Sequence, residues 1–250
     1  MPASERPVAL VTGSATGVGR ACALRFANAG YDVVINYTRS EKEAAQTATD
    51  AEQAGAATLM VQCDVSDDEA VRGMIAQIGE RFGRLDRLVN NAACTYFIEH
   101  ANLEELTGDK WDRILSVNVK GAFFVTRAAV PMLREAAGAA VVNISSVAGV
   151  SGLGSSIAYC ASKGALNTMT KSLARTLAPE IRVNAVCPGP IDTRWLREWK
   201  SAEEIEQMTS DYPIPRAAVP EDVADVVMYL ANGTELTTGQ CLVVDGGRTI

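Results

Sequence analysis

The stretch VALVTGSATGVGRACALRFANAG, residues 8–30, decides the fold of this chain. Residues 8–12 form a short apolar run that predicts a buried strand, and residues 20–29 predict a helix. The turn between them carries Gly13, Gly17 and Gly19, and glycines let a backbone approach a bound anion closely. A strand, a glycine-rich turn and the N-terminus of a helix in succession predict a phosphate-binding unit that opens a parallel sheet.

The rest of the chain continues the alternation of strand and helix. Further strands are expected at residues 32–37, 58–62, 85–90, 139–144, 182–187 and 240–244. Helices are expected at residues 40–54, 66–82, 111–135 and 156–177, and from Pro220 onward; Ser40 with Glu43 and Ser66 with Glu69 suggest capping boxes. The alternation predicts a single-domain α/β Rossmann fold over residues 1–250, with a doubly wound, seven-stranded parallel sheet and helices on both faces.

Composition narrows the class of protein. Of the 250 residues, 48% are hydrophobic and 21% are charged, which is ordinary for a globular chain. A net charge of −7 without a dense Lys/Arg cluster argues against nucleic-acid binding. No apolar run reaches the roughly 18–20 residues that a membrane span needs, and no signal-type stretch opens the chain, so the cytoplasm is the expected location. The six scattered cysteines predict reduced thiols rather than disulfides or a metal site.

Tyr159 and Lys163 are candidate catalytic residues because they lie four positions apart in a predicted helix. At that spacing two side chains share one helix face, so an ammonium group stands beside a phenol. A nearby positive charge stabilises the phenolate, and we therefore expect the pKa of Tyr159 to fall below its usual value of about 10. Such a phenol can exchange a proton with a carbonyl or alcohol oxygen, which the Ser146 hydroxyl can also bind; Ser145 is a competing candidate for that contact.

These motifs resemble those of the short-chain dehydrogenase/reductase family. The TGxxxGxG turn at residues 12–19 and the set Ser146, Tyr159 and Lys163 carry the resemblance, which runs from Val8 to Gly247. It is nearest to the 3-oxoacyl-[acyl carrier protein] reductases. The resemblance implies an oxidoreductase that interconverts a carbonyl and a secondary alcohol, with Tyr159 as proton donor. It also implies that Asn118 completes the catalytic set by holding a water, that a substrate flap lies at residues 190–216, and that the protein is a homotetramer.

The resemblance also assigns the residues that hold a nicotinamide cofactor, mostly at the ends of strands. They are Gly13, Ser14, Thr16, Gly17, Val18, Gly19, Tyr37, Thr38, Arg39, Asp64, Val65, Asn91, Ala92, Ala93, Tyr159, Lys163, Pro188, Gly189, Ile191 and Thr193. Ala93 departs from the family pattern, which has glycine there, and its methyl group removes some backbone freedom.

The end of the second expected strand predicts which nicotinamide cofactor is used. An acidic residue at this place would hold the ribose 2′-hydroxyl of NAD, but Tyr37, Thr38, Arg39 and Ser40 stand there instead. A guanidinium and two hydroxyls can bind a 2′-phosphate, and no carboxylate repels it. The sequence therefore predicts NADP(H) rather than NAD(H).

Other functions stay open at this point. Sugar, steroid and xenobiotic alcohol dehydrogenases share the scaffold. Residues 134–140 carry one cation, Arg134, and one anion, Glu135, where 3-oxoacyl reductases usually have basic residues that bind an acyl carrier protein. A catalytically silent nucleotide-binding regulator is a second class, against which the full set of Asn118, Ser146, Tyr159 and Lys163 argues. A serine hydrolase is a third class, which lacks support because there is no GxSxG and the single histidine is His100.

Overall fold

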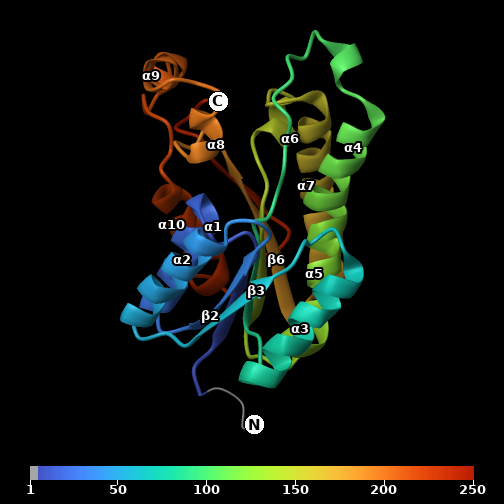
Figure 1. Ribbon diagram of the computed structural model, residues 1–250, viewed down its shortest axis with the longest axis vertical. Coiled ribbons are helices and arrows are strands. Elements are labelled where there is room, and N and C mark those ends of the chain that lie inside the picture. Colours follow the sequence, from blue (N-terminus) through green and yellow to red (C-terminus); the bar gives the residue numbers. More distant parts are fainter. Residues whose placement is uncertain (1–4) are drawn as a thin grey trace.

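The centre of the computed structural model, which describes residues 5–250, is one sheet (Figure 1). Its seven strands, counted over those residues, pair in parallel in the order β3-β2-β1-β4-β5-β6-β7. They are β1 Val8–Val11, β2 Asp32–Tyr37, β3 Thr58–Gln62, β4 Arg87–Asn90, β5 Ala139–Ile144, β6 Ile181–Pro188 and β7 Cys241–Val244. The doubly wound, seven-stranded parallel sheet expected from the sequence is confirmed.

Helices cover both faces of the sheet (Figure 1). One layer is α1 (Gly17–Asn28), α2 (Glu41–Gln53) and α10 (Pro220–Asn232); the other is α3 (Asp68–Phe82), α5 (Ala122–Arg134) and α7 (Ile157–Leu177). Successive side chains of a strand point to opposite faces, so Val33 packs in the first layer and Val34 in the second. Because both faces are covered, these strands are almost continuously apolar, and this is why the sequence shows them as short hydrophobic runs.

Several helix starts differ from the expected ones. Helix α1 begins at Gly17, inside the glycine-rich turn, and not at residue 20. Both expected capping boxes are wrong. The Ser40 side chain makes no cap bond to α2, whereas α3 is capped by Asp67, whose carboxylate accepts from the backbone N–H groups of Glu69 and Ala70. A carboxylate at the N-cap satisfies two otherwise free N–H groups, which leaves Ser66 outside the helix.

The helix expected over residues 111–135 is interrupted. It consists of α4 (Gly108–Leu115), a π-helical turn η2 (Ser116–Gly121) and α5. A Cβ at Gly121 would lie 2.7 Å from Cγ2 of Val65, so this turn approaches the end of β3 more closely than any other residue type would allow. Turns of this kind are frequent at functional sites, and Asn118 lies in this one.

The remaining short helices gather beyond the carboxyl ends of the strands (Figure 1). They are η1 (Leu103–Glu105), α6 (Ala148–Ser151), α8 (Arg194–Arg197) and α9 (Ala202–Thr209). The last two lie within residues 190–216, where the family resemblance implied a substrate flap. In open parallel sheets this edge is where ligands bind.

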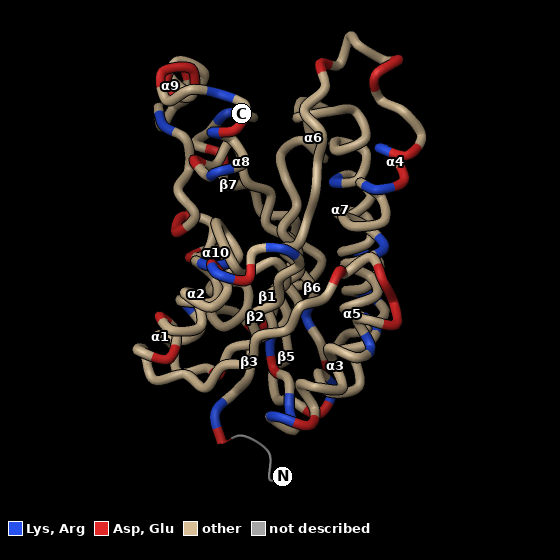
Figure 2. Tube along the Cα trace, in the orientation of Figure 1, with Lys and Arg blue, Asp and Glu red and all other residues tan. Residues whose placement is uncertain are grey.

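Basic and acidic residues are interspersed along the outer helices and loops (Figure 2). No helix within residues 5–250 is both long and apolar enough to cross a membrane.

Candidate active site

The glycine-rich turn after β1 is held tightly against the end of β4. The side-chain amide of Asn91 donates hydrogen bonds to the carbonyl oxygens of Thr12 and Gly13, at 2.9 and 3.0 Å. Gly13 has φ of +63°, and a Cβ at Gly19 would lie 2.4 Å from the Gly13 carbonyl oxygen. Thr16 at the start of α1 makes no side-chain cap bond, so the first N–H groups of that helix are free to bind an anion.

A cavity of about 280 Å³ adjoins this turn. It is lined by Gly13, Ala15, Thr16, Tyr37, Thr38, Arg39, Ser40 and Arg194. The structure thus brings the turn together with the three residues after β2 that the sequence singled out. Arg194 was missed. It comes from α8, and its guanidinium lies 3.6 Å from a carboxylate oxygen of Glu43 on α2. Because the two residues are far apart in the chain, no sequence motif around either one predicts this contact.

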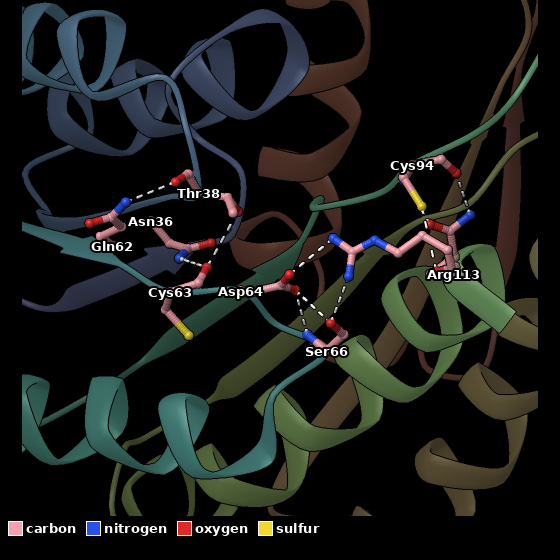
Figure 3. Close-up of polar contacts among 9 residues, drawn as sticks. Asn36, Thr38, Gln62, Cys63, Asp64, Ser66, Cys94 and Arg113 are labelled. Atoms are coloured by element: carbon pink, nitrogen blue, oxygen red, sulfur yellow. Dashed lines mark hydrogen bonds and ion pairs between the residues drawn. The ribbon is translucent and has the colours of Figure 1, made fainter. Parts of the chain in front are cut away.

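The end of β3 is joined to α4 by a chain of polar contacts (Figure 3). The Asp64 carboxylate accepts from the Ser66 hydroxyl at 2.7 Å and from the Arg113 guanidinium at 2.9 Å. Burial alone would raise the pKa of Asp64, but the hydrogen bonds from Ser66 and Arg113 outweigh it and lower the pKa. Arg113, which the sequence did not single out, therefore fixes Asp64, one of the residues expected to hold the cofactor.

The other predicted cofactor residues surround the same edge. Ser14 is fully buried and its hydroxyl donates to the Val11 carbonyl, so its side chain supports the turn. Thr193 lies over the turn, with its methyl group 3.7 Å from where a Cβ at Gly17 would be. Val18 lies in the first turn of α1, and Val65, Ala92, Ala93, Pro188, Gly189 and Ile191 lie at or just after the ends of β3, β4 and β6. Cofactor contact by these residues stays a prediction.

Ser146, Tyr159 and Lys163 come together at the end of β5 and the first turn of α7. Helix α7 begins at Ile157, and the Ser156 hydroxyl caps it by accepting from the backbone N–H of Tyr159 at 3.3 Å. The Ser146 hydroxyl donates to the Pro188 carbonyl at 3.5 Å and accepts from the Ala148 N–H at 3.1 Å. Its hydrogen-bonding influence on the Tyr159 phenol acts to lower the pKa of that group. The Lys163 amine lies 5.6 Å from the centre of the Tyr159 ring. The spacing of four residues along one helix thus places the Lys163 amine beside the Tyr159 ring, as expected.

The competing candidate Ser145 has a different place. It is buried, and its hydroxyl donates to the backbone carbonyl of Lys163 at 3.2 Å. It therefore holds α7 against β5, whereas Ser146 is the serine whose hydrogen bonding influences the pKa of the Tyr159 phenol.

Asn118 braces the loop after β4 against α7. Its side-chain oxygen accepts from the Cys94 N–H at 2.8 Å, and its amide donates to the Cys94 carbonyl and to the Ser162 hydroxyl, both at 3.0 Å. Ser162 in turn donates to the Tyr159 carbonyl at 2.7 Å. Both amide N–H donors are therefore occupied, and a water held by Asn118 stays a prediction.

The expected lowering of the Tyr159 pKa is wrong for this structure. Burial raises the pKa of Tyr159 to about 12, although the hydrogen bond with Ser146 acts in the opposite direction. Burial also lowers the pKa of Lys163 to about 8. The amine donates to the Ile144 carbonyl at 2.7 Å. Loss of hydration on burial is the largest influence on the pKa of both groups.

Comparisons with known proteins show what the whole chain is similar to. A family model described as enoyl-(acyl carrier protein) reductase matches residues 13–249. A Streptomyces violaceoruber protein assigned as ketoacyl reductase 2 of the granaticin polyketide synthase is 44% identical over 98% of this chain and 97% of its own length. The 3-oxoacyl-[acyl-carrier-protein] reductase of Staphylococcus aureus is 38% identical over 96% of each chain. A solved Burkholderia xenovorans structure, assigned as a short-chain dehydrogenase/reductase, superposes with a TM-score of 0.92 at 40% identity and 98% coverage of both chains.

Proposed function

The chain belongs to the short-chain dehydrogenase/reductase family and is a NAD(P)-dependent oxidoreductase of ketone and CH–OH groups, and from this premise we propose that it reduces a ketone with NADPH. One observation carries the proposal: Ser146, Tyr159 and Lys163 meet at the sheet edge that also carries the glycine-rich turn. A phenol, a hydroxyl and an amine in this arrangement can bind a carbonyl oxygen and protonate it.

The residues around the turn fit a dinucleotide. The space that a Cβ at Gly19 would fill lets the backbone come close to a pyrophosphate, and the free N–H groups at the start of α1 suit its negative charge. Arg39 and Arg194 line the adjoining cavity and suit a 2′-phosphate. Asn91 and Thr193 support the proposal because they close the turn from two other strand ends. When bound, the nicotinamide supplies hydride to the substrate carbon.

The proton comes from the protein. Tyr159 keeps its proton throughout the neutral range because its pKa is about 12, and it can therefore act as the general acid toward the substrate oxygen. Ser146 holds that oxygen by a hydrogen bond, which positions it for protonation. The Lys163 charge, next to the ring, stabilises the negative charge that passes from the substrate oxygen to the phenol.

This role for Lys163 predicts a pH dependence. With a pKa of about 8, the amine is charged at lower pH and loses its proton as the pH rises through that value. We expect kcat/KM for ketone reduction to be constant between pH 6 and 7 and to fall above about pH 8, approaching tenfold per pH unit. Initial rates in buffers of constant ionic strength measure this pH profile of kcat/KM. A profile that stays flat to pH 10 would contradict the role of the charge.

The cofactor preference is tested by Arg39→Ser. Loss of hydrogen bonds to a charged phosphate costs about 1.5–3 kcal/mol, so kcat/KM for NADPH should fall about 10- to 100-fold. The value for NADH should change less than about threefold, because NADH lacks the 2′-phosphate. Lys42→Ser is the matched control, since Lys42 is exposed and does not line the cavity. Equal losses with both cofactors, or a wild-type enzyme that prefers NADH, contradict the assignment.

The ketone itself is proposed from the relatives. Proteins named as ketoacyl reductases are 38–44% identical over almost the whole chain, which supports a 3-oxoacyl compound as substrate. Sugar, steroid and xenobiotic alcohols are the alternatives. The proposal is tested by an absorbance assay that follows NADPH oxidation in the presence of 3-oxoacyl thioesters, sugars or cyclic ketones. Cofactor binding without turnover of any ketone would favour the silent regulator instead.

Assembly and location complete the proposal. Exposed apolar side chains on β7 and α10, namely Leu242, Val243 and Tyr229, support self-association, and we propose the homotetramer of related enzymes. All six cysteines are free thiols, which supports a reducing compartment such as the cytoplasm.

A further inference from the structure

Aromatic side chains stand beside the proton-donating phenol. Trp195, on α8, places its ring 6.4 Å from the Tyr159 ring, centre to centre, at an interplanar angle of 82°. One turn further on, Trp199 stacks on Phe97 with 5.0 Å between ring centres and 20° between planes. Trp195 and Trp199 remain 39% and 41% exposed. These large rings are only half-buried, so packing of the core does not account for them.

The rings belong to segments that are tied together around Tyr159. Phe97 lies in the loop after β4, where the Ile98 N–H donates to the Ser155 carbonyl at 2.9 Å. The Thr95 and Ser155 hydroxyls are 2.6 Å apart, and Ser155 precedes Tyr159 by four residues. The Phe97–Trp199 stack joins this loop to the segment that carries Trp195. The three segments therefore form a continuous wall beside the phenol.

The apolar character extends to the segment before α7. Leu153 is 58% exposed, and it precedes Gly154, where a Cβ would lie 3.4 Å from the Tyr159 ring. Leu153 thus leaves an aliphatic side chain exposed in the segment that adjoins the Tyr159 ring. A long-chain or ring substrate can bury these groups, whereas a sugar needs several hydrogen-bonding partners in their place.

The charged side chains of the same segment are engaged with other groups. Arg197 pairs with Asp192 at 2.6 Å, and Arg194 with Glu43 at 3.6 Å. The Lys200 amine lies 4.6 Å from the centre of the Trp199 ring, as a cation over an aromatic face. Because Trp199 is already stacked on Phe97 and lies under the Lys200 amine, the half-exposed Trp195 is the ring beside Tyr159 that is left for stacking.

We propose that the ketone accepted here is carried on a flat, fused or aromatic ring system, and that Trp195 is the specificity-determining residue that stacks on it. The inference rests on the proposed ketone reductase and narrows its substrate class. Ring pairs gain about 0.5–1.5 kcal/mol beyond the area that they bury. A linear 3-oxoacyl chain fills the same space without that gain.

Two ketones of one carbon skeleton test the proposal. 2-Tetralone has an aromatic ring fused to the ring that carries the carbonyl, and trans-2-decalone is its saturated counterpart; neither carbonyl is conjugated. We expect Trp195→Leu to lower kcat/KM for 2-tetralone about tenfold and for 2-decalone less than about threefold. Trp195→Phe, which keeps a ring, should leave the ratio of the two values within about threefold of wild type. Trp111→Leu, on α4, makes the same change outside the three segments of the wall and should leave the ratio unaltered.

Equal losses for both ketones, or no change in their ratio, overturn the inference. A binding measurement separates its failure from that of the proposed function. Calorimetric titration with 2-naphthol, which has the flat ring system and no ketone to reduce, should show about tenfold weaker binding to Trp195→Leu, against little change for trans-2-decalol. If the wild type reduces no ketone, the proposed function fails, and the titration with 2-naphthol then tests the wall by itself. If Trp195→Leu binds 2-naphthol as tightly as the wild type, the inference that the wall selects flat rings is overturned as well.

Discussion

Replacing Tyr159 with phenylalanine is expected to lower kcat for ketone reduction by about 10²–10⁴-fold, the usual contribution of a positioned general acid. The substitution removes one hydroxyl and keeps the ring, so the contacts with Trp195 and with the Lys163 amine have the same partners. Without the phenol hydroxyl, the side chain at this position can no longer donate a proton to the substrate oxygen. Single-turnover rates with NADPH measure the loss directly.

Binding must be followed together with the rate. The dissociation constant of Tyr159→Phe for NADPH should stay within about threefold of wild type, because the glycine-rich turn lies on other elements. Tyr229→Phe is the matched control: Tyr229 is exposed on α10, and the same change there should leave kcat unaltered. Near wild-type turnover by Tyr159→Phe would remove the phenol from the mechanism.

Gly19→Ala is expected to weaken NADPH binding by about 10- to 100-fold and to destabilise the fold by about 1–3 kcal/mol. The new Cβ would lie 2.4 Å from the Gly13 carbonyl oxygen and 2.5 Å from the Asn91 amide nitrogen. The first of these atoms belongs to the backbone, so the whole turn must move. That movement also breaks the hydrogen bonds of Asn91 that shape the turn.

A glycine-to-alanine substitution at a second position is the control for Gly19→Ala. Gly73, in the middle of α3, has nothing within 4 Å of the position of a Cβ. Gly73→Ala should stabilise the protein by roughly 0.5–1 kcal/mol, because alanine loses less backbone freedom in a helix, and should leave the NADPH affinity unchanged. Thermal unfolding and titration of NADPH fluorescence give both quantities for each variant. If Gly19→Ala binds NADPH like the wild type, close approach at this turn is not what holds the cofactor.

Much of the fold was predictable because its signals are local. A strand covered on both faces shows as a short apolar run, and β2, β3 and β5 begin and end where those runs do. The helix starts were less predictable. Ser40 and Ser66 have the spacing of capping boxes, but Asp67 is the group that caps α3, because which of several neighbouring polar side chains reaches the N–H groups depends on the path of the preceding loop.

For residues of the site that lie on one helix or in one turn, the sequence by itself determined which of them share a surface, because their spacing along the chain decides it. The glycine-rich turn follows from residues 13–19, and the pairing of Tyr159 with Lys163 follows from four residues of helix. The end of each parallel strand supplies a further residue to one edge, so the approximate membership of the site was also predictable.

Tertiary structure alone decided the contacts that join distant elements and the electrostatics that depend on burial. Arg194 lines the cavity beside Arg39, Arg113 fixes Asp64, and Trp195 stands against Tyr159, each across a long interval of chain. The pKa of Tyr159 moved opposite to the expectation, because a neighbouring charge can be read from spacing, whereas the loss of water around a hydroxyl depends on every element packed near it.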